Sequence, residues 1–239
     1  MLKAVFFDLD GTLLPMNENE FINEYFRLMS NKMSNYGFEP NELKKNIWDG
    51  TKLMYMNDGT STNKEVFWNY FKKIYGNSII NKKEEFDKFY VNEFKQLVNC
   101  CGSNPHAKEI VNFVNQNNLI CVLSTNPIFP KAGTLTRMGF VGLIEQDFKF
   151  ITAYENSNFT KPNPLYFKGL LEKFNLQPEE VILIGNNELE DAWCASQIGI
   201  DSYLVKDFLI PSDKLENKVP IISIEEVISI IEKEIINRK

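Results

Sequence analysis

Two carboxylates stand close together near the start of the chain: Asp8 and Asp10, followed by the turn-forming pair Gly11 and Thr12. Residues 4–7 before them form an apolar run that suits a buried parallel strand. Alternate residues of a strand share a face, so both carboxylates should lie together at its carboxyl end, where open α/β sheets place their sites. Two like charges this close are costly unless a cation, a shared proton or a reaction requires them. The pattern therefore favours chemistry over a simple Asx turn.

Further polar groups follow later elements of the same kind. Ser124, Thr125 and Asn126 come after the apolar run 119–123, so we expect the hydroxyl of Thr125 or Ser124, with backbone N–H groups, at the same sheet edge. Lys161 precedes Pro162, which disfavours helical backbone at the lysine and places it in a stiff loop. Because two prolines, Pro162 and Pro164, fix the backbone here, a specific role for the lysine is favoured over a simple solvated charge.

A fourth polar segment follows the apolar run 181–184. It begins with two amides, Asn186 and Asn187, and continues with the carboxylates Glu190 and Asp191 at the expected start of a helix. The segment therefore brings both uncharged and charged oxygen atoms to the edge of the predicted sheet.

In this order, the four motifs resemble those of the haloacid dehalogenase-like (HAD) hydrolase superfamily, specifically its phosphatases with a helical cap inserted after the first motif. The resemblance covers nearly the whole chain. The stretches that carry it are Asp8–Thr12, Thr125-Asn126, Lys161–Phe167 and Gly185–Asp191.

The resemblance implies a role for each of four catalytic residues. Asp8 would attack phosphorus and form an aspartyl-phosphate that water then hydrolyses. Asp10 would donate a proton to the leaving oxygen and later take one from the attacking water. Thr125 would hydrogen-bond a phosphoryl oxygen, and Lys161 would offset the charge of Asp8 and the phosphoryl group.

The resemblance also implies a substrate-binding set and a Mg²⁺ cofactor. The substrate-binding residues would be Gly11, Thr125, Asn126 and Lys161, and the metal-binding residues would be Asp8, Asp10, Asn186 and Asn187. This chain departs from the family where relatives usually carry an aspartate, at position 186 or 187. An amide oxygen still binds Mg²⁺, but it adds no negative charge, so we expect a lower metal affinity.

The chain divides into two kinds of sequence. Residues 16–98 show helical periodicity and an aromatic stripe, and the capping box Thr62–Glu65 opens one of the predicted helices. From residue 104 onward, apolar runs alternate with helical patterns. We therefore predict a doubly wound, Rossmann-like α/β core with a parallel sheet, formed by residues 1–15 and 99–239, and an inserted all-α cap domain at 16–98.

The predicted elements of the core can be placed by residue range. Strands are expected near 4–7, 119–123, 148–152, 181–184, 203–205 and 221–222. Helices are expected at 104–117, 164–175 and 190–198 and after Ser223. Within the cap, Met54, Tyr55 and Met56 are candidates for substrate contact, although packing inside the bundle is the favoured interpretation.

Composition limits the possible partners of the protein. The formal net charge of −6 argues against nucleic acid as the main partner, and we expect a small phosphorylated molecule instead. The four cysteines have no zinc or disulfide spacing, and the single histidine, His106, reads as a surface helix residue. Because neither a signal peptide nor a transmembrane-length apolar run is apparent, we expect a cytoplasmic protein without membrane contact. The oligomeric state stays open.

Three alternatives to a Mg²⁺-dependent phosphatase stay open. A dehalogenase-type hydrolase would use the same Asp8 attack on carbon without a metal, and a phosphomutase would deliver the phosphoryl group elsewhere. A catalytically weak member of the fold would bind a phosphorylated ligand. Asp10 argues against the dehalogenase, because a halide leaves without needing a proton.

Overall fold

A six-stranded parallel sheet forms the centre of the larger part of the molecule, in a computed structural model that describes residues 1–215 and 218–238. Its strand order is β3-β2-β1-β4-β5-β6, which reverses direction between β1 and β4. The carboxyl ends of strands at such a reversal form a crevice where ligands bind. The strands are β1 (Ala4–Phe7), β2 (Ile120–Leu123), β3 (Phe150–Ile151), β4 (Val181–Gly185), β5 (Asp201–Val205) and β6 (Ile221–Ile222). The predicted α/β fold with a parallel sheet is therefore confirmed.

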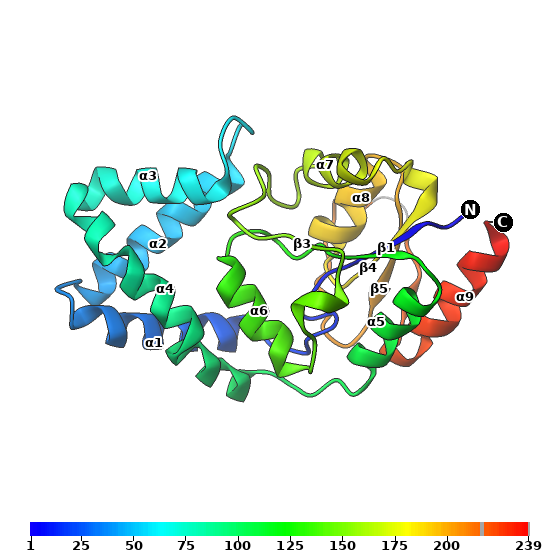
Figure 1. Cartoon of the computed structure of the whole chain (residues 1–239), viewed down its shortest axis with the longest axis horizontal. Coiled ribbons are helices and arrows are strands. Elements are labelled where there is room, and N and C mark those ends of the chain that lie inside the picture. Colours follow the sequence, from blue (N-terminus) through cyan, green and yellow to red (C-terminus); the bar gives the residue numbers. More distant parts are fainter. Residues whose placement is uncertain (216–217, 239) are drawn as a thin grey trace.

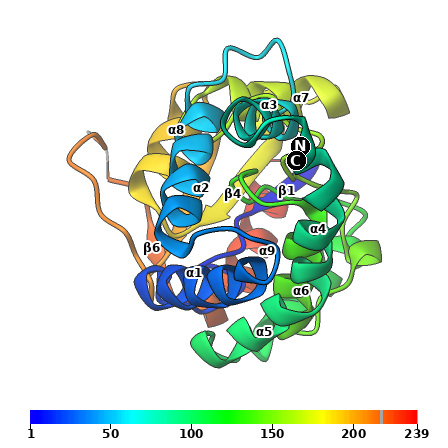
Figure 2. The ribbon, with the colours of Figure 1, turned by 90° about the vertical axis from the view of Figure 1, so that its left-hand side faces the viewer.

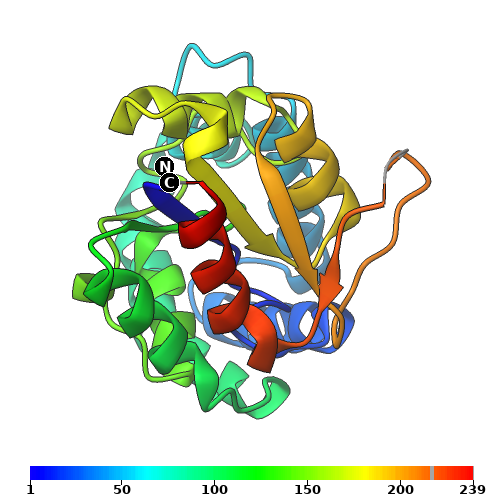
Figure 3. The ribbon, with the colours of Figure 1, turned by 90° about the vertical axis from the view of Figure 1, so that its right-hand side faces the viewer.

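Helices cover both faces of the sheet, and the residues of β1 explain why. Val5 and Phe7 pack on the face covered by α5 (His106–Gln116) and α9 (Val227–Asn237), two helices that contact each other (Figure 3). Ala4 and Phe6 point to the opposite face, covered by α7 (Leu165–Phe174) and α8 (Cys194–Ser196). A strand that is apolar at every position is stable only between two such layers.

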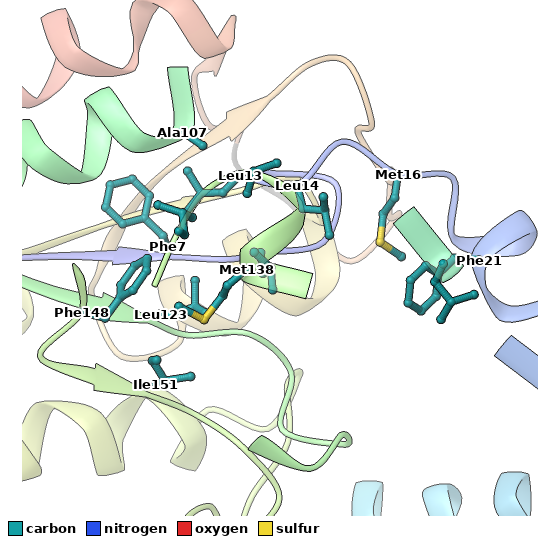
Figure 4. Packing of buried hydrophobic residues seen from close by; sticks show 14 of the residues in the cluster. Phe7, Leu13, Leu14, Met16, Phe21, Ala107, Leu123, Met138, Phe148 and Ile151 are labelled. Atoms are coloured by element: carbon teal, nitrogen blue, oxygen red, sulfur yellow. The ribbon is translucent and has the colours of Figure 1, made fainter. Parts of the chain in front are cut away.

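The packing beside β1 continues toward the end of the sheet that carries the polar motifs. Phe7, Leu123 and Ile151 come from three neighbouring strands, and Met138 of α6 (Lys131–Phe140) packs with them (Figure 4). All four side chains are at least 95% buried. The strand ends that follow these residues are thus held on a rigid base.

The described elements between β1 and α5 are all helical and lie at one end of the molecule, beyond the carboxyl ends of the strands (Figures 1 and 2). The helical content expected for this segment is confirmed. Its elements are α1 (Glu18–Ser34), α2 (Pro40–Tyr55), α3 (Asn63–Tyr75), η1 (Asn77–Lys82), α4 (Lys83–Val91) and η2 (Glu93–Cys100). Throughout the described ranges, we find no helix that is both long and apolar enough to cross a membrane.

Aromatic packing holds this helical segment together. The ring of Tyr25 makes edge contacts with Phe26, Phe89 and Phe94, at centroid distances of 5.0, 5.8 and 6.1 Å. Tyr25 also packs against Phe129, a residue of the α/β part, at 5.5 Å. This aromatic cluster around Tyr25 therefore joins the helical segment to the α/β part.

The capping box predicted at Thr62–Glu65 is confirmed, and Thr62 is the N-cap residue of α3.

The chain enters and leaves the helical segment at neighbouring points. The N–H of Gly102 donates to the carbonyl of Pro15 over 2.7 Å, and Met16 forms an antiparallel bridge with Cys101. The two connections, separated by the whole helical segment in sequence, are therefore paired in space.

The structure differs from the predicted elements in three places. The sequence did not predict α6, because Gly133, Thr134 and Gly139 give it a poor helical propensity. The strand expected at 148–152 is shorter, covering only Phe150–Ile151. The helix expected at 190–198 begins instead as a π-helical turn, Glu188–Trp193 (η5), which continues into α8.

Two glycines of α6 provide a matched test of the packing between this helix and α4. A Cβ atom at Gly133 would lie 2.8 Å from Cδ1 of Tyr90, whereas one at Gly139 would meet no atom within 4 Å. We expect Gly133→Ala to destabilise the protein by about 1–2 kcal/mol, because the ring must shift. Gly139→Ala should stabilise it by about 0.5–1 kcal/mol through helical propensity. Urea unfolding of both variants measures the two effects, and a stabilising Gly133→Ala would contradict this packing.

Candidate active site

The polar motifs meet at the carboxyl ends of β1, β2 and β4, on the wall of a cavity of about 330 Å³ that extends into the helical segment. Of the eight residues that the sequence singled out, seven line this cavity, and Gly11 does not. The seven are Asp8, Asp10, Thr125, Asn126, Lys161, Asn186 and Asn187. Residues far apart in the sequence are thus brought together as the sheet topology requires.

A buried lysine joins the first motif to the last. Lys161 Nζ lies 2.8 Å from Oδ1 of Asp8 and 2.6 Å from Oδ1 of Asp191, and the lysine is 1% exposed. Both carboxylates are also buried, Asp191 completely. One cation thus lies between two anions in a region from which water is nearly excluded, so breaking either contact would leave a buried charge uncompensated.

The protonation of this cluster depends on burial and on the shared cation. Burial raises the pKa of the Asp8 carboxyl, Lys161 opposes that shift, and the charges of Asp191 and Asp10 add to it. Burial would lower the pKa of Lys161, but the two carboxylates outweigh it and raise that pKa above its usual range. Lys161 is therefore a permanent cation, and an ionised Asp8 is costly unless further positive charge approaches.

Asp191 also organises the backbone that follows β4. Its Oδ2 accepts hydrogen bonds from the backbone N–H groups of Asn186 and Asn187, each over 3.0 Å. The side chain of Asn187 caps η5, since its Oδ1 accepts from the N–H groups of Leu189 and Glu190. A single carboxylate thus fixes both Lys161 and the loop that carries the two asparagines.

Asn186 lies against the first motif. Its Oδ1 accepts a hydrogen bond from the hydroxyl of Thr12 over 3.0 Å, and its Nδ2 donates to the carbonyl of Phe208 over 2.8 Å. Gly11 has a φ of +80°, and a Cβ there would lie 2.2 Å from Nδ2 of Asn186. The glycine therefore permits both the turn and the close approach of the amide.

The sequence did not indicate the partner of Asp10. Arg137 of α6, only 1% exposed, forms an ion pair through Nη1 with Oδ2 of Asp10. The guanidinium lies over the ring of Phe129, with 4.7 Å between Cζ and the ring centroid. The other oxygen of Asp10, Oδ1, is buried and has no hydrogen-bond partner among the described residues.

A hydrogen-bond network joins the helical segment to the site. Asn126 Nδ2 donates to Oε2 of Glu190 over 2.9 Å and to the hydroxyl of Tyr55 over 3.2 Å. Tyr55 in turn donates to Oε1 of Glu190 over 3.3 Å. Burial raises the pKa of Glu190 to about 7, with the nearby charge of Lys161 opposing the shift. The expectation of packing inside the bundle was therefore wrong for Tyr55. It was also wrong for Met56, which is exposed, and it is confirmed for Met54.

The oxygen atoms at the site suit a hard cation, although they are few. Within residues 1–215 and 218–238, no three His, Cys, Asp or Glu side chains gather as a metal-binding group. Asp8 and Asn186 nevertheless bring a carboxylate and an amide oxygen to the cavity wall. Mg²⁺ typically takes one or two protein carboxylates and completes its shell with water and substrate phosphate. A site of this kind fits the donors present.

Comparison with known proteins agrees with this arrangement. The family model described as haloacid dehalogenase-like hydrolase matches residues 5–205. A curated relative, the glyceraldehyde 3-phosphate phosphatase of Methanothermobacter thermautotrophicus, is 22% identical over 236 residues, which cover 90% of each chain.

Two solved structures are similar in fold across almost their whole length. A HAD phosphatase from Thermococcus onnurineus has a TM-score of 0.60 and 18% identity, covering 96% of this chain and 98% of that one. The L-2-haloacid dehalogenase of Xanthobacter autotrophicus has a TM-score of 0.58 and 12% identity, covering 97% and 99%. The fold is thus shared by enzymes of both chemistries, and the choice between them depends on the site itself.

The buried pair between Arg137 and Asp10 can be tested against an exposed pair on the same helix. We expect Arg137→Met to lower the free energy of unfolding by about 2–3 kcal/mol, because Asp10 loses a buried partner. Lys131→Met removes an exposed pair with Glu145 and should cost less than about 1 kcal/mol. Urea denaturation of the two variants measures the difference. Equal losses would show that burial adds nothing to the Asp10 pair.

Proposed function

Because the chain belongs to the haloacid dehalogenase-like hydrolase family, we propose that this hydrolase is a Mg²⁺-dependent phosphatase of a small phosphomonoester. The observation that carries the proposal is the second carboxylate, Asp10, which lines the same cavity as Asp8 and has one oxygen without a hydrogen-bond partner among the described residues. A phosphate ester needs a proton on its leaving oxygen, and a halide does not. The phosphatase relative at 22% identity supports the same choice.

Asp8 is the proposed nucleophile. Its carboxylate attacks phosphorus, the bond to the leaving oxygen breaks, and an aspartyl-phosphate forms that water hydrolyses in a second step. Lys161, at 2.8 Å, holds the carboxylate in place and offsets the charge that accumulates beside it. Because Asp191 fixes the lysine from the other side, Lys161 stays in position while Asp8 reacts.

Asp10 is the proposed acid and base. Its ion pair with Arg137 fixes one carboxyl oxygen, which leaves Oδ1 to give a proton to the leaving oxygen and to take one from the attacking water. Arg137 acts on the reaction through Asp10, so we describe it as a positioning residue. Its burial means that the carboxyl group has little freedom to rotate away.

The remaining predicted residues have supporting roles in this proposal. Thr125 lines the cavity and hydrogen-bonds a phosphoryl oxygen. Nδ2 of Asn126 is engaged by Glu190 and Tyr55, whereas its Oδ1 has no hydrogen-bond partner among the described residues and is left to accept a hydrogen bond from the substrate. The N–H of Gly11 donates to Leu14, which suits a structural role better than the substrate contact that the resemblance implies.

The proposed Mg²⁺ would be held by a carboxylate oxygen of Asp8, the backbone carbonyl of Asp10 and the amide oxygen of Asn186. Of the two asparagines we favour Asn186, because its amide oxygen accepts one hydrogen bond, from Thr12, whereas the oxygen of Asn187 accepts two from the backbone where it caps η5. When bound, the ion supplies positive charge to the transferring phosphoryl group. An uncharged amide at this position supports the expectation of a modest affinity.

We also propose that residues 16–98 form a cap domain over a catalytic core made of residues 1–15 and 99–239. The paired connections at Pro15 and Gly102 would be its hinges, and the contact of Tyr55 with Glu190 would hold the cap on the core. Closure favours phosphoryl transfer by excluding water from the reacting groups. The four cysteines are free, which fits the cytoplasmic location that we propose.

A metal-independent dehalogenase-type reaction is the second candidate, because the uncharged Asn186 and Asn187 favour it. In that reaction Asp8 would attack carbon, and a halide would leave without protonation. Asp10, held by the buried Arg137, would then have no proton to transfer, and for this reason the dehalogenase-type reaction is the second candidate.

Hydrolysis of an aryl phosphate across a Mg²⁺ titration tests the phosphatase directly, with Asp8→Asn as the control. We expect saturable, metal-dependent phosphate release that falls at least about a thousandfold in the variant, because the nucleophile is lost. The Asp8→Asn variant should stay folded, because it removes one buried negative charge while the ion pair between Lys161 and Asp191 remains. A thermal melting curve checks that the variant is folded. Release of halide from a haloacid, without phosphate release at any metal concentration, would favour the second candidate.

Restoring a carboxylate separates the two asparagines. We expect Asn186→Asp to tighten Mg²⁺ binding by about tenfold or more, because it adds a second negative charge to the donor set. Asn187→Asp should change little, since aspartate caps a helix as well as asparagine does. Titration calorimetry with Mg²⁺ alone measures both without depending on turnover. A gain confined to Asn187→Asp would overturn the assignment of Asn186.

A further inference from the structure

The part of the cavity contributed by the helical segment is lined mainly by aromatic side chains. Phe26 of α1, Trp48 of α2, Phe67 and Trp68 of α3 and Phe86 of α4 all line it. The rings of Phe26 and Trp48 lie 5.5 Å apart at an angle of 39°, and those of Trp68 and Phe86 meet edge to face at 5.6 Å. The part of the cavity within the helical segment is therefore mainly apolar, with aromatic rings on its walls.

The charges that line the cavity do not match a second anionic group on the substrate. Among the described residues, the only lysine and arginine that line it are Lys161 and Arg137, and both are already paired with carboxylates of the site. The charged groups that line it from the helical segment are Glu18 and Asp87, and both are acidic. A leaving group with a carboxylate or a second phosphate would thus meet acidic groups and no free cation on the lining.

Lysines do occur nearby, but they do not face the cavity. Lys44 lies over the ring of Phe26 at 5.3 Å, and Lys83 lies over the ring of Trp68 at 5.4 Å. Neither is among the lining residues. These lysines thus contact rings of the cavity wall without lining the cavity themselves.

The size of the cavity limits the leaving group further. A volume of about 330 Å³ is at the lower end of the range for small-molecule sites, roughly 300–1,000 Å³. The phosphoryl group takes the polar end beside Asp8, so the remaining space suits one compact ring system. An apolar ring gains binding free energy there by leaving water, whereas a polyhydroxylated chain would gain less from a lining that is mainly apolar.

We propose that the preferred substrate is a phosphomonoester with an uncharged aromatic leaving group, with its ring held between Phe26, Trp48 and Trp68. This inference rests on the proposed phosphatase function and specifies its substrate class. It differs from what a relative that acts on glyceraldehyde 3-phosphate would suggest, because that leaving group is short and polar.

The experiment compares alkyl phosphates whose leaving alcohols have similar reactivity and differ in character. The substrates are 2-phenylethyl phosphate, glyceraldehyde 3-phosphate, phosphoglycolate and phosphocholine, with acetyl phosphate as a reactive donor that needs no pocket for its leaving group. We expect kcat/KM for 2-phenylethyl phosphate to exceed that of each of the other three esters by at least about tenfold, which corresponds to about 1.4 kcal/mol.

A matched pair of variants tests whether the aromatic wall sets this preference. Trp48 and Leu53 both lie on α2 and are both 39% exposed, but only Trp48 lines the cavity. Trp48→Lys should lower the ratio of kcat/KM for 2-phenylethyl phosphate over phosphoglycolate by at least about tenfold, because it replaces an apolar wall with a cation. Leu53→Lys should leave the ratio unchanged. Both substrates are measured on one preparation, so any loss of folded protein cancels.

The outcomes separate failure of the substrate class from failure of the proposed function. No phosphate release from any compound, acetyl phosphate included, would overturn the phosphatase and this inference with it. Turnover of acetyl phosphate together with a preference for glyceraldehyde 3-phosphate, phosphoglycolate or phosphocholine would overturn the substrate class alone. An equal change of the ratio in Trp48→Lys and Leu53→Lys would show that the aromatic wall does not set the preference.

Discussion

The candidate site depends on one buried ammonium group shared by two carboxylates. Lys161 comes from a loop, Asp8 from the end of β1 and Asp191 from η5, so the contact joins three segments that otherwise meet only at the sheet edge. Asp191 extends the constraint to the backbone of Asn186 and Asn187. Because none of these charges reaches bulk water freely, each ionised carboxylate is stable there only while Lys161 stays in place. Burying these charges costs desolvation free energy, but it fixes the positions of the side chains around the proposed nucleophile.

A second buried pair, between Arg137 and Asp10, gives the site its other fixed carboxylate. The two pairs have different surroundings: Lys161 lies among carboxylates and amides, whereas Arg137 lies against an aromatic ring that belongs to the cluster around Tyr25. The position of Asp10 therefore depends on how the helical segment packs against α6. The helical segment would then contribute to the geometry of the proposed site as well as form the proposed cap over it.

Much of the fold and of the candidate site could be predicted from sequence because the signals are local. Apolar runs such as 181–184 locate buried strands, and Asp8 and Asp10 follow one of them at a spacing that places both on one face. Parallel strands align their carboxyl ends, so predicting the strands also predicts which polar residues meet. Of the two carboxylates in the fourth motif, Glu190 and Asp191, it is Asp191 that contacts Lys161.

What the sequence did not indicate depends on contacts between distant residues. Arg137 is 127 positions from Asp10 in the sequence. It lies on α6, whose glycines lower the helical propensity of its sequence, so the helix was not predicted and the arginine would be expected to be a solvent-exposed charge. Tyr55 lies in a segment that is rich in aromatic residues throughout. Its sequence therefore does not distinguish a ring that only packs from one whose hydroxyl contacts Asn126.

The two connections to the helical segment, which meet where Gly102 donates to Pro15, also depend on a contact between distant residues, and they bear on the ancestry of the chain. A segment whose two ends are hydrogen-bonded neighbours can be gained, lost or exchanged without opening the sheet, so the α/β part and the helical part are free to diverge at different rates. Chemistry would be inherited with the first part, and ligand preference would be acquired with the second.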